Sequence, residues 1–161
     1  MTKLVPLPPC GLYRTTRAIG KAQAIPAAQL VMFHNHSEQG EPIALLPERN
    51  VNNRWQFASK GFLLDDAEEI ASLEPLPREG FYVLKEHFHV DAKSVVAKGQ
   101  LLQLGYNQRG EAIFFFPTQS QLANALEFPV QGLGVRAELL ELLQAVDLRG
   151  VYVPEPAPAV V

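Results

Sequence analysis

The chain of 161 residues contains a single cysteine, Cys10, so it can form no disulfide bond within itself. It also lacks a positive charge excess, because 14 Lys and Arg stand against 17 Asp and Glu and the net charge is −3 at pH 7. Proteins that bind the phosphate backbone of nucleic acids usually carry a basic surplus, so this balance disfavours nucleic-acid binding. A lone cysteine suits a reducing compartment, and we expect the protein to be cytoplasmic.

Long hydrophobic runs are missing too. No stretch approaches the ~18 apolar residues that a membrane-spanning helix requires. Within residues 1–10, Pro6, Pro8 and Pro9 interrupt the apolar run that a secretion signal would need. We therefore expect a soluble protein with no membrane partner. Residues 1–10 should form a proline-rich leader, and residues 149–161, rich in Pro and Ala, an extended tail.

Recognisable catalytic motifs are also absent from the sequence. It contains no glycine-rich phosphate loop and no nucleophile elbow. Cys10 lies in the leader, where the fixed histidine neighbour of a catalytic thiol is not expected. The sequence therefore favours a non-enzymatic protein, and an enzyme stays an open alternative.

An internal duplication is the strongest pattern that the sequence does contain. GLYRTTRAI recurs as GFYVLKEHF, QLVMFHNHSEQGEPIALLP recurs as QLLQLGYNQRGEAIFFFP, and the segment at Phe57 recurs at Phe128. The offsets between these segments are 69 to 71 residues. Because the offset stays nearly constant across three separate segments, we predict two copies of one unit, over residues 11–76 and 80–148. The matching positions include Gly11/Gly80, Gly40/Gly110, Pro47/Pro117 and Gly61/Gly132.

Each unit is expected to be rich in β-strands. A first strand starts at Gly-x-Tyr, a hairpin turns at Gly40 or Gly110, and a short strand follows through RWQF or ALEF. A helix then closes each unit, with Asp65 as the N-cap of the first. The fold class that follows is mainly β, with two tandem, small antiparallel barrel-like units of SH3-like size packed about a pseudo-twofold axis. The second helix, expected within 135–146, should present one apolar face: Leu139, Leu140, Leu142 and Leu143.

The four histidines form two pairs, His34 with His36 and His87 with His89. Residues two apart in a strand point to the same face, so each pair can present two imidazoles together. Zinc takes three or four protein ligands, which the two pairs could supply if they meet in space. A site for a transition metal such as zinc, and with it a metal-dependent enzyme, is therefore the alternative hypothesis. The fold itself does not require these histidines, because the other unit carries different residues there: Gly105, Asn107, Ala18 and Gly20.

His34, His36 and Glu41 also resemble the first motif of the cupin family, in which His-x-His is followed by a glutamate. That resemblance implies a metal-binding site. The glycines of the family motif and its second, histidine-bearing motif are missing, so we do not assign the chain to the family. The recurrence of Gly40 and Glu41 as Gly110 and Glu111 is explained by the duplication without a metal.

Two further segments are candidate binding sites. Arg54 and Trp55 would form an anchor for a partner if Trp55 is exposed, although a single Trp in a small β protein is also typical of a core. In IFFFP, strand alternation turns either Phe114 and Phe116 or Phe115 outward, unless both faces are covered. The sequence therefore predicts a non-enzymatic binding, adaptor or structural protein that contacts another protein or a second copy of itself.

Overall fold

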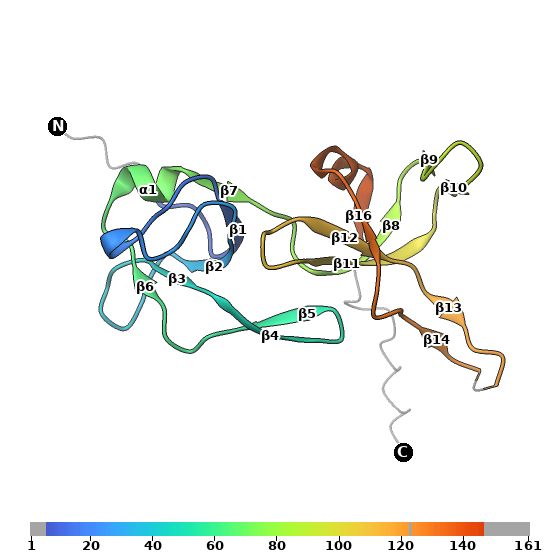
Figure 1. Cartoon of the computed structure of the whole chain (residues 1–161), viewed down its shortest axis with the longest axis horizontal. Coiled ribbons are helices and arrows are strands. Elements are labelled where there is room, and N and C mark those ends of the chain that lie inside the picture. The colour runs from blue at the N-terminus through green and yellow to red at the C-terminus, as the bar shows by residue number, and fades with distance from the viewer. Residues whose placement is uncertain (1–5, 123, 147–161) are drawn as a thin grey trace, which may run out of the picture.

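A computed structural model of the chain describes residues 6–122 and 124–146 (Figure 1). The first half of the expected leader and the whole of the expected tail at 149–161 lie outside the described residues. The fold is mainly β with antiparallel sheets, as the sequence predicts. Among the described residues, no helix has the length and apolar character needed to cross a membrane.

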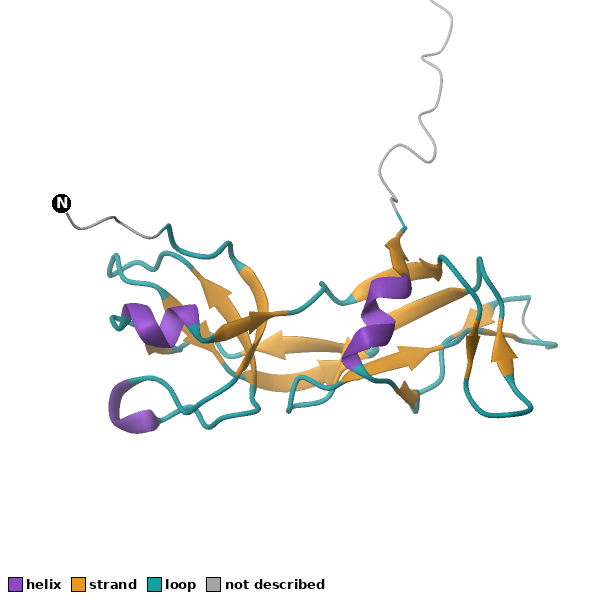
Figure 2. Ribbon diagram, turned by 90° about the horizontal axis from the view of Figure 1, so that it is seen from above, coloured by secondary structure: helices purple, strands orange, loops and turns teal. Residues whose placement is uncertain are grey.

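Two five-stranded antiparallel sheets form the body of the molecule (Figures 1 and 2). We call residues 11–76 unit 1 and residues 80–146 unit 2, since each range contributes one sheet. Sheet 1 has the order β6-β3-β2-β1-β7 and is built from β1 (Gly11–Thr15), β2 (Leu30–His34), β3 (Ile43–Leu45), β6 (Phe62–Leu63) and β7 (Leu73–Pro75). Sheet 2 has the order β15-β12-β11-β8-β16 and is built from β8 (Gly80–Leu84), β11 (Leu101–Tyr106), β12 (Ala112–Phe115), β15 (Leu133–Gly134) and β16 (Leu143–Ala145).

The two sheets have the same strand order and the same register. Gly11 pairs with Phe33 in sheet 1, and Gly80 pairs with Leu104 in sheet 2, at positions that the sequence alignment matches. The same correspondence runs through the hairpin and both edge strands of each sheet. Residues that lie 69 to 71 positions apart in the chain therefore occupy equivalent places in the two sheets.

Hydrogen bonding does not close either sheet into a barrel among the described residues, because each strand order ends at two edge strands that do not pair with each other. Instead, three two-stranded ribbons extend from the sheets. The short strands expected in RWQF and ALEF are present, each paired with the segment before it. The ribbons are β4 (Pro47–Val51) with β5 (Arg54–Phe57), β9 (Phe88–His89) with β10 (Val95–Val96), and β13 (Thr118–Gln119) with β14 (Leu126–Glu127).

The helical segments differ from the sequence prediction. Helix α1 (Ala67–Ala71) is capped by Asp66 and not by Asp65, because the Asp66 carboxylate accepts the Glu68 and Glu69 amides at 2.8 and 3.4 Å. The expected second helix is a short 3₁₀ helix, η2 (Ala137–Leu142), and the chain turns extended from Leu143 to form β16. The four leucines of its expected apolar face still pack against the core of unit 2. A further 3₁₀ turn, η1 (Lys21–Gln23), lies after β1.

The hydrophobic core has two clusters, and one of them crosses the boundary between the units. Unit 1 has its own cluster, which includes Val31 and Phe33. The second cluster gathers residues of unit 2, such as Leu104, together with Leu12 and Leu30 of unit 1. Leu30 is fully buried and Leu12 is 5% exposed. Because burial of apolar area is the main stabilising contribution to folding, the shared cluster binds the two units together.

Candidate functional site

The β4–β5 ribbon, which we call the arm of unit 1, reaches across the boundary and lies on unit 2 (Figure 1). At its tip, Asn53 Nδ2 donates to Gln103 Oε1 at 3.0 Å and to the Pro129 carbonyl at 3.1 Å. In return, Gln103 Nε2 donates to the Asn52 carbonyl at 2.8 Å. Gln103 is only 5% exposed, and a buried amide is costly unless both of its ends are hydrogen-bonded. These reciprocal bonds therefore fix the position of the arm on unit 2.

Trp55 makes the second contact of the arm. Its Nε1 donates to the Tyr106 carbonyl at 2.7 Å, and its ring packs against the core cluster of unit 2. Tyr106 in turn donates its hydroxyl to the Pro77 carbonyl at 2.7 Å, and burial raises the pKa of this hydroxyl far above its ordinary value. The predicted binding anchor is thus half-buried between the units, while Arg54 beside it is exposed.

Glu79 lies beneath the arm and is 7% exposed. Its Oε2 accepts the Trp55 amide at 3.1 Å, whereas Oε1 has no hydrogen-bond partner among the described residues. Burial raises the pKa of this carboxyl above its ordinary value of 4.5, because desolvation disfavours the charged form. The Trp55 amide and the Arg54 guanidinium act in the opposite direction but do not cancel the effect of burial.

We expect the Glu79→Gln variant to become more stable relative to the wild type as the pH rises. A carboxyl whose pKa is raised on folding contributes most to stability below its unfolded-state pKa, and this contribution is lost as the pH rises through the folded-state pKa. Glutamine keeps an acceptor for the Trp55 amide but does not ionise. Urea unfolding followed by circular dichroism, between about pH 4 and pH 8, measures the free-energy difference. A difference that stays constant over this range would show that Glu79 ionises equally easily in both states.

The β11–β12 turn of unit 2 docks on the outer side of sheet 1, which gives the boundary a second set of contacts. The Gln108 carbonyl accepts the Leu30 amide at 2.8 Å, and the Arg109 carbonyl accepts Arg14 Nε at 2.8 Å. Gly110 (φ +70°) lies so close to the aliphatic part of Arg14 that a Cβ there would approach it to 3.1 Å. The turn belongs to unit 2 and contacts unit 1, whereas the arm belongs to unit 1 and contacts unit 2. Together these contacts fix the arrangement of the two units.

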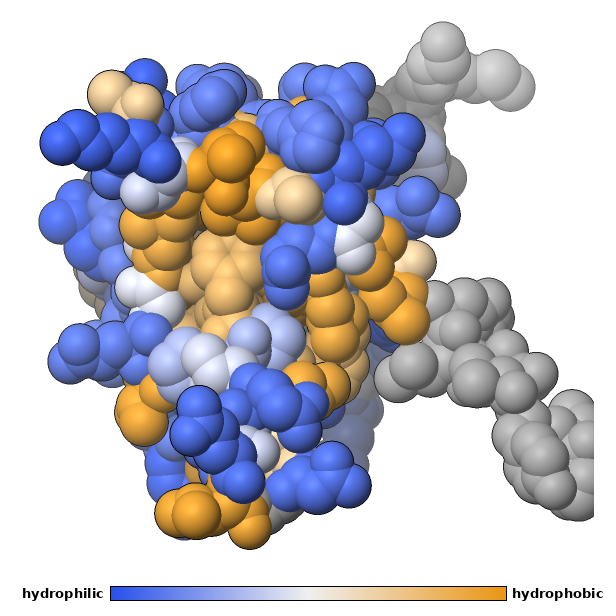
Figure 3. All heavy atoms as spheres, turned by 90° about the vertical axis from the view of Figure 1, so that its right-hand side faces the viewer, coloured by the Kyte–Doolittle hydropathy of each residue, from blue (hydrophilic) through white to orange (hydrophobic). Residues whose placement is uncertain are grey.

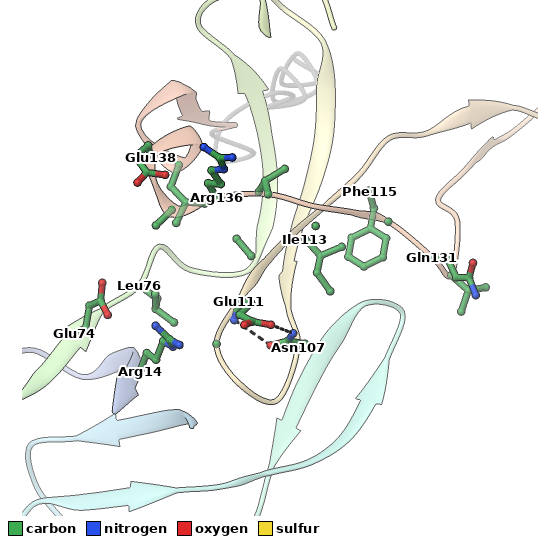
Figure 4. A pocket seen from close by; sticks show the side chains of 18 residues that line it. Arg14, Glu74, Leu76, Asn107, Glu111, Ile113, Phe115, Gln131, Arg136 and Glu138 are labelled. Atoms are coloured by element: carbon green, nitrogen blue, oxygen red, sulfur yellow. Dashed lines mark hydrogen bonds between the residues drawn. The ribbon is translucent and has the colours of Figure 1, made fainter. Parts of the chain in front are cut away.

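Beside the contact between the β11–β12 turn and Arg14, the junction is hollowed into a groove of about 910 Å³ (Figure 4). Unit 1 and the segment that follows β7 supply one wall, whereas η2 and the end of β12 supply the other. Apolar side chains of Ile113 and Phe115 project into it, and edge strand β15 contributes Gly134. The groove therefore combines an apolar floor with charges of both signs from both units: Arg14, Glu74, Glu111, Arg136 and Glu138.

The two histidine pairs do not meet. His34 ends β2 in unit 1, whereas His89 ends β9 near the other end of the molecule (Figure 1). The rings of His34 and His36 are 6.1 Å apart, and Nδ1 of His87 accepts the Lys98 amide at 3.0 Å. Over residues 6–122 and 124–146, no three His, Cys, Asp or Glu side chains gather to hold a metal ion. The transition-metal hypothesis stays a prediction, which elemental analysis of the wild type beside a His34→Ala/His36→Ala variant tests.

The aromatic segment of β12 is covered on both faces. Phe114 is fully buried and Phe115 is 5% exposed. Phe88 packs edge-on against Phe114 at 6.2 Å, and half-buried Phe116 does so at 6.3 Å. Phe114 and Phe115 are therefore core residues, which is the case of two covered faces that the sequence left open, and a binding role for half-buried Phe116 stays a prediction.

Three surfaces are thus described: the boundary held by the arm, the groove beside it, and the separate histidine pairs. The boundary residues Asn53, Glu79 and Gln103 were not among the sequence candidates. Comparison with protein-family models, with curated proteins and with solved structures found no match to this chain.

Proposed function

We propose that the protein is a non-enzymatic adaptor, built from two copies of a small β unit of SH3-like size, that binds an extended segment of another polypeptide in the groove between the units. The equal strand order and register of the two sheets support the duplication. So do Tyr13 and Tyr82, which each donate their hydroxyl to the carbonyl four residues earlier. The observation that carries the binding proposal is the groove, because its walls come from both units.

An extended polypeptide fits the chemistry of this groove. Strand β15 is an edge strand of sheet 2, and edge strands can accept an added strand through main-chain hydrogen bonds. Half-buried Ile113 and exposed Val130, which both line the groove, offer apolar contacts to side chains of such a segment. Arg136, the N-cap residue of η2, and Glu138 on η2 lie opposite Arg14 and favour a partner that carries charges of both signs.

Site-specific photo-crosslinking in cells of the source organism tests the proposal. We expect a benzophenone amino acid at Gln131 or Glu138, which line the groove, to capture the same discrete polypeptide. A matched probe at Lys60, which is exposed and outside the groove, should not capture it. The captured protein is then purified and titrated against the wild type and an Arg136→Glu variant. We expect the variant to bind about tenfold more weakly, a difference of about 1.4 kcal/mol.

Three outcomes would overturn the adaptor function. Equal capture at Lys60 would show that the adducts do not report on the groove. Adducts of twice the chain mass at both groove positions would show that the groove holds a second copy instead of another protein. An absence of adducts at both groove positions, with the probe incorporated and the protein folded, would show that no polypeptide lies there.

A further inference from the structure

Unit 1 contacts unit 2 through one of its surfaces, and unit 2 has an equivalent surface at its far end, away from unit 1. Unit 1 uses Leu12 on β1 and Trp55 on the arm, both of which pack against the core cluster of unit 2. The equivalent positions in unit 2 are Phe81 on β8, which has the register of Leu12, and Leu126 on β14. Ribbon β13–β14 is likewise the counterpart of the arm, and it projects away from unit 1 (Figure 1). Among residues 6–122 and 124–146, no further β unit lies beside this surface, which we call the end face.

The end face is apolar where a soluble surface is usually polar. Phe81 is 39% exposed, Leu126 is 58% exposed, and Leu122 near the ribbon tip is fully exposed. The rings of Phe81 and Phe128 lie 5.3 Å apart, so sheet 2 and the end of the ribbon belong to one continuous surface. Figure 3 shows this end of the molecule, with apolar side chains gathered into a central patch inside a polar rim. A patch with that pattern is typical of a protein–protein interface.

The matching surface is at the opposite end of the chain. Inside the molecule, unit 1 receives the β11–β12 turn of unit 2, with Gly110 against the stem of Arg14. The counterpart of that turn in unit 1 is the β2–β3 turn, in which Gly40 replaces Gly110 and also has a positive φ, +96°. A Cβ built at Gly40 meets nothing within 4 Å, and residues 38–41 around it are exposed. The tip of the β2–β3 turn of unit 1 is therefore exposed, whereas its counterpart in unit 2, the β11–β12 turn, packs against unit 1.

We infer that copies of this chain associate head to tail, with the β2–β3 turn of one copy docked on the end face of the next. The contact repeats the arrangement that already joins unit 1 to unit 2, so the structure itself contains its template. Such an interface is heterologous, since two different surfaces meet, and it produces open chains or closed rings. The head-to-tail contact uses a different surface from the groove, so a test of this association does not depend on the adaptor function.

Sedimentation velocity across micromolar to high-micromolar concentrations tests the association. We expect the weight-average mass of the wild type to increase with concentration, because the contact is intermolecular and lacks the covalent linker that joins the units. Leu126→Lys places a charge in the end face and should reduce the association at least tenfold. The matched control is Leu63→Lys, since Leu63 is also an exposed apolar side chain, 38% exposed, but lies on β6 of unit 1. Leu63→Lys should associate as the wild type does.

A mixing experiment distinguishes head-to-tail association from a symmetric dimer. Gly40→Asn adds a side chain at the turn but keeps the fold, because asparagine tolerates a positive φ. We expect it, like Leu126→Lys, to remain monomeric alone, because each variant loses one half of the contact. An equimolar mixture should form mixed dimers, since each chain retains the half that the other lacks. Circular dichroism confirms that each variant is folded.

The inference is overturned if the wild type stays monomeric at every concentration. It is also overturned if Leu126→Lys associates as strongly as Leu63→Lys, which would place the contact elsewhere. A mixture that gives no mixed dimers, from variants that are each folded and monomeric, also overturns it, because the turn of one copy then does not dock on the end face of the next. Dimers formed by Gly40→Asn alone would show that two end faces meet.

Discussion

Replacing Gly132 with alanine is expected to reduce the free energy of unfolding by about 1–3 kcal/mol, because the added methyl group has no space. A Cβ on Gly132 would lie 2.5 Å from Cγ2 of Ile113 and 2.7 Å from the Phe114 carbonyl oxygen. The backbone oxygen belongs to β12, in the centre of the sheet, and cannot move without disturbing its pairing. Urea unfolding followed by circular dichroism measures the loss.

Gly134→Ala is the matched control for this experiment. Gly134 lies two residues further along the same segment, and a Cβ there meets nothing within 4 Å. We expect its unfolding free energy to stay within about 0.5 kcal/mol of the wild type. Gly61, the counterpart of Gly132 in unit 1, faces the equivalent Ala44 carbonyl, so Gly61→Ala should be as harmful as Gly132→Ala. Equal stability of the Gly132→Ala and Gly134→Ala variants would contradict the steric argument.

Truncating Trp55 to alanine is expected to cost about 3 kcal/mol and to weaken the coupling between the units. The change removes the ring that packs against the core of unit 2, and it leaves the Tyr106 carbonyl without its donor. Because the arm is one of the attachments across the boundary, beside the shared core cluster and the β11–β12 turn, we expect thermal unfolding to broaden or to split into two transitions. Differential scanning calorimetry measures both the loss and the change in shape.

One further variant separates packing from hydrogen bonding at this position, and a second is its control. Trp55→Phe keeps an aromatic ring but loses the donor, and we expect it to cost about 1 kcal/mol. Gln56→Ala alters the exposed neighbour on the same strand and should change stability by less than about 0.5 kcal/mol. If Trp55→Ala unfolds in a single sharp transition at the temperature of Gln56→Ala, the arm does not couple the units.

Much of the strand arrangement could be predicted from the sequence, because the signals for it are local. Gly40 and Gly110 mark the two hairpin turns, and alternating β-forming residues mark the strands on either side. The closing strands β7 and β16 could not be predicted in this way. Each has only three residues directly after a helix, and Leu143 fits a helical apolar face as well as a strand. The choice between Asp65 and Asp66 as cap likewise depends on where the backbone turns.

The candidate site was harder to predict, because its contacts join residues far apart in the chain. Trp55 was recognised as either a core residue or an anchor, but its partner Tyr106 is 51 residues away. A signal did exist for Gln103, a polar residue at a position where unit 1 has Met32. Glu79 gave no such signal, since a glutamate beside a proline-rich linker is usually exposed. The end face has no local sequence signal, because it is defined by which strand positions of the two units are equivalent in space.

The core cluster shared by the two units has a consequence for the newly made chain. Strand β7 completes sheet 1 before any strand of unit 2 has been synthesised, so unit 1 can begin to fold on the ribosome. Leu12 and Leu30 then face water until β11, β12 and their turn have emerged. Sheet 2 itself waits for β16, which ends at Ala145. During this interval of translation the apolar side chains of the shared cluster are exposed to water. Chaperones can then bind the nascent chain, and neighbouring nascent chains can form incorrect contacts with it.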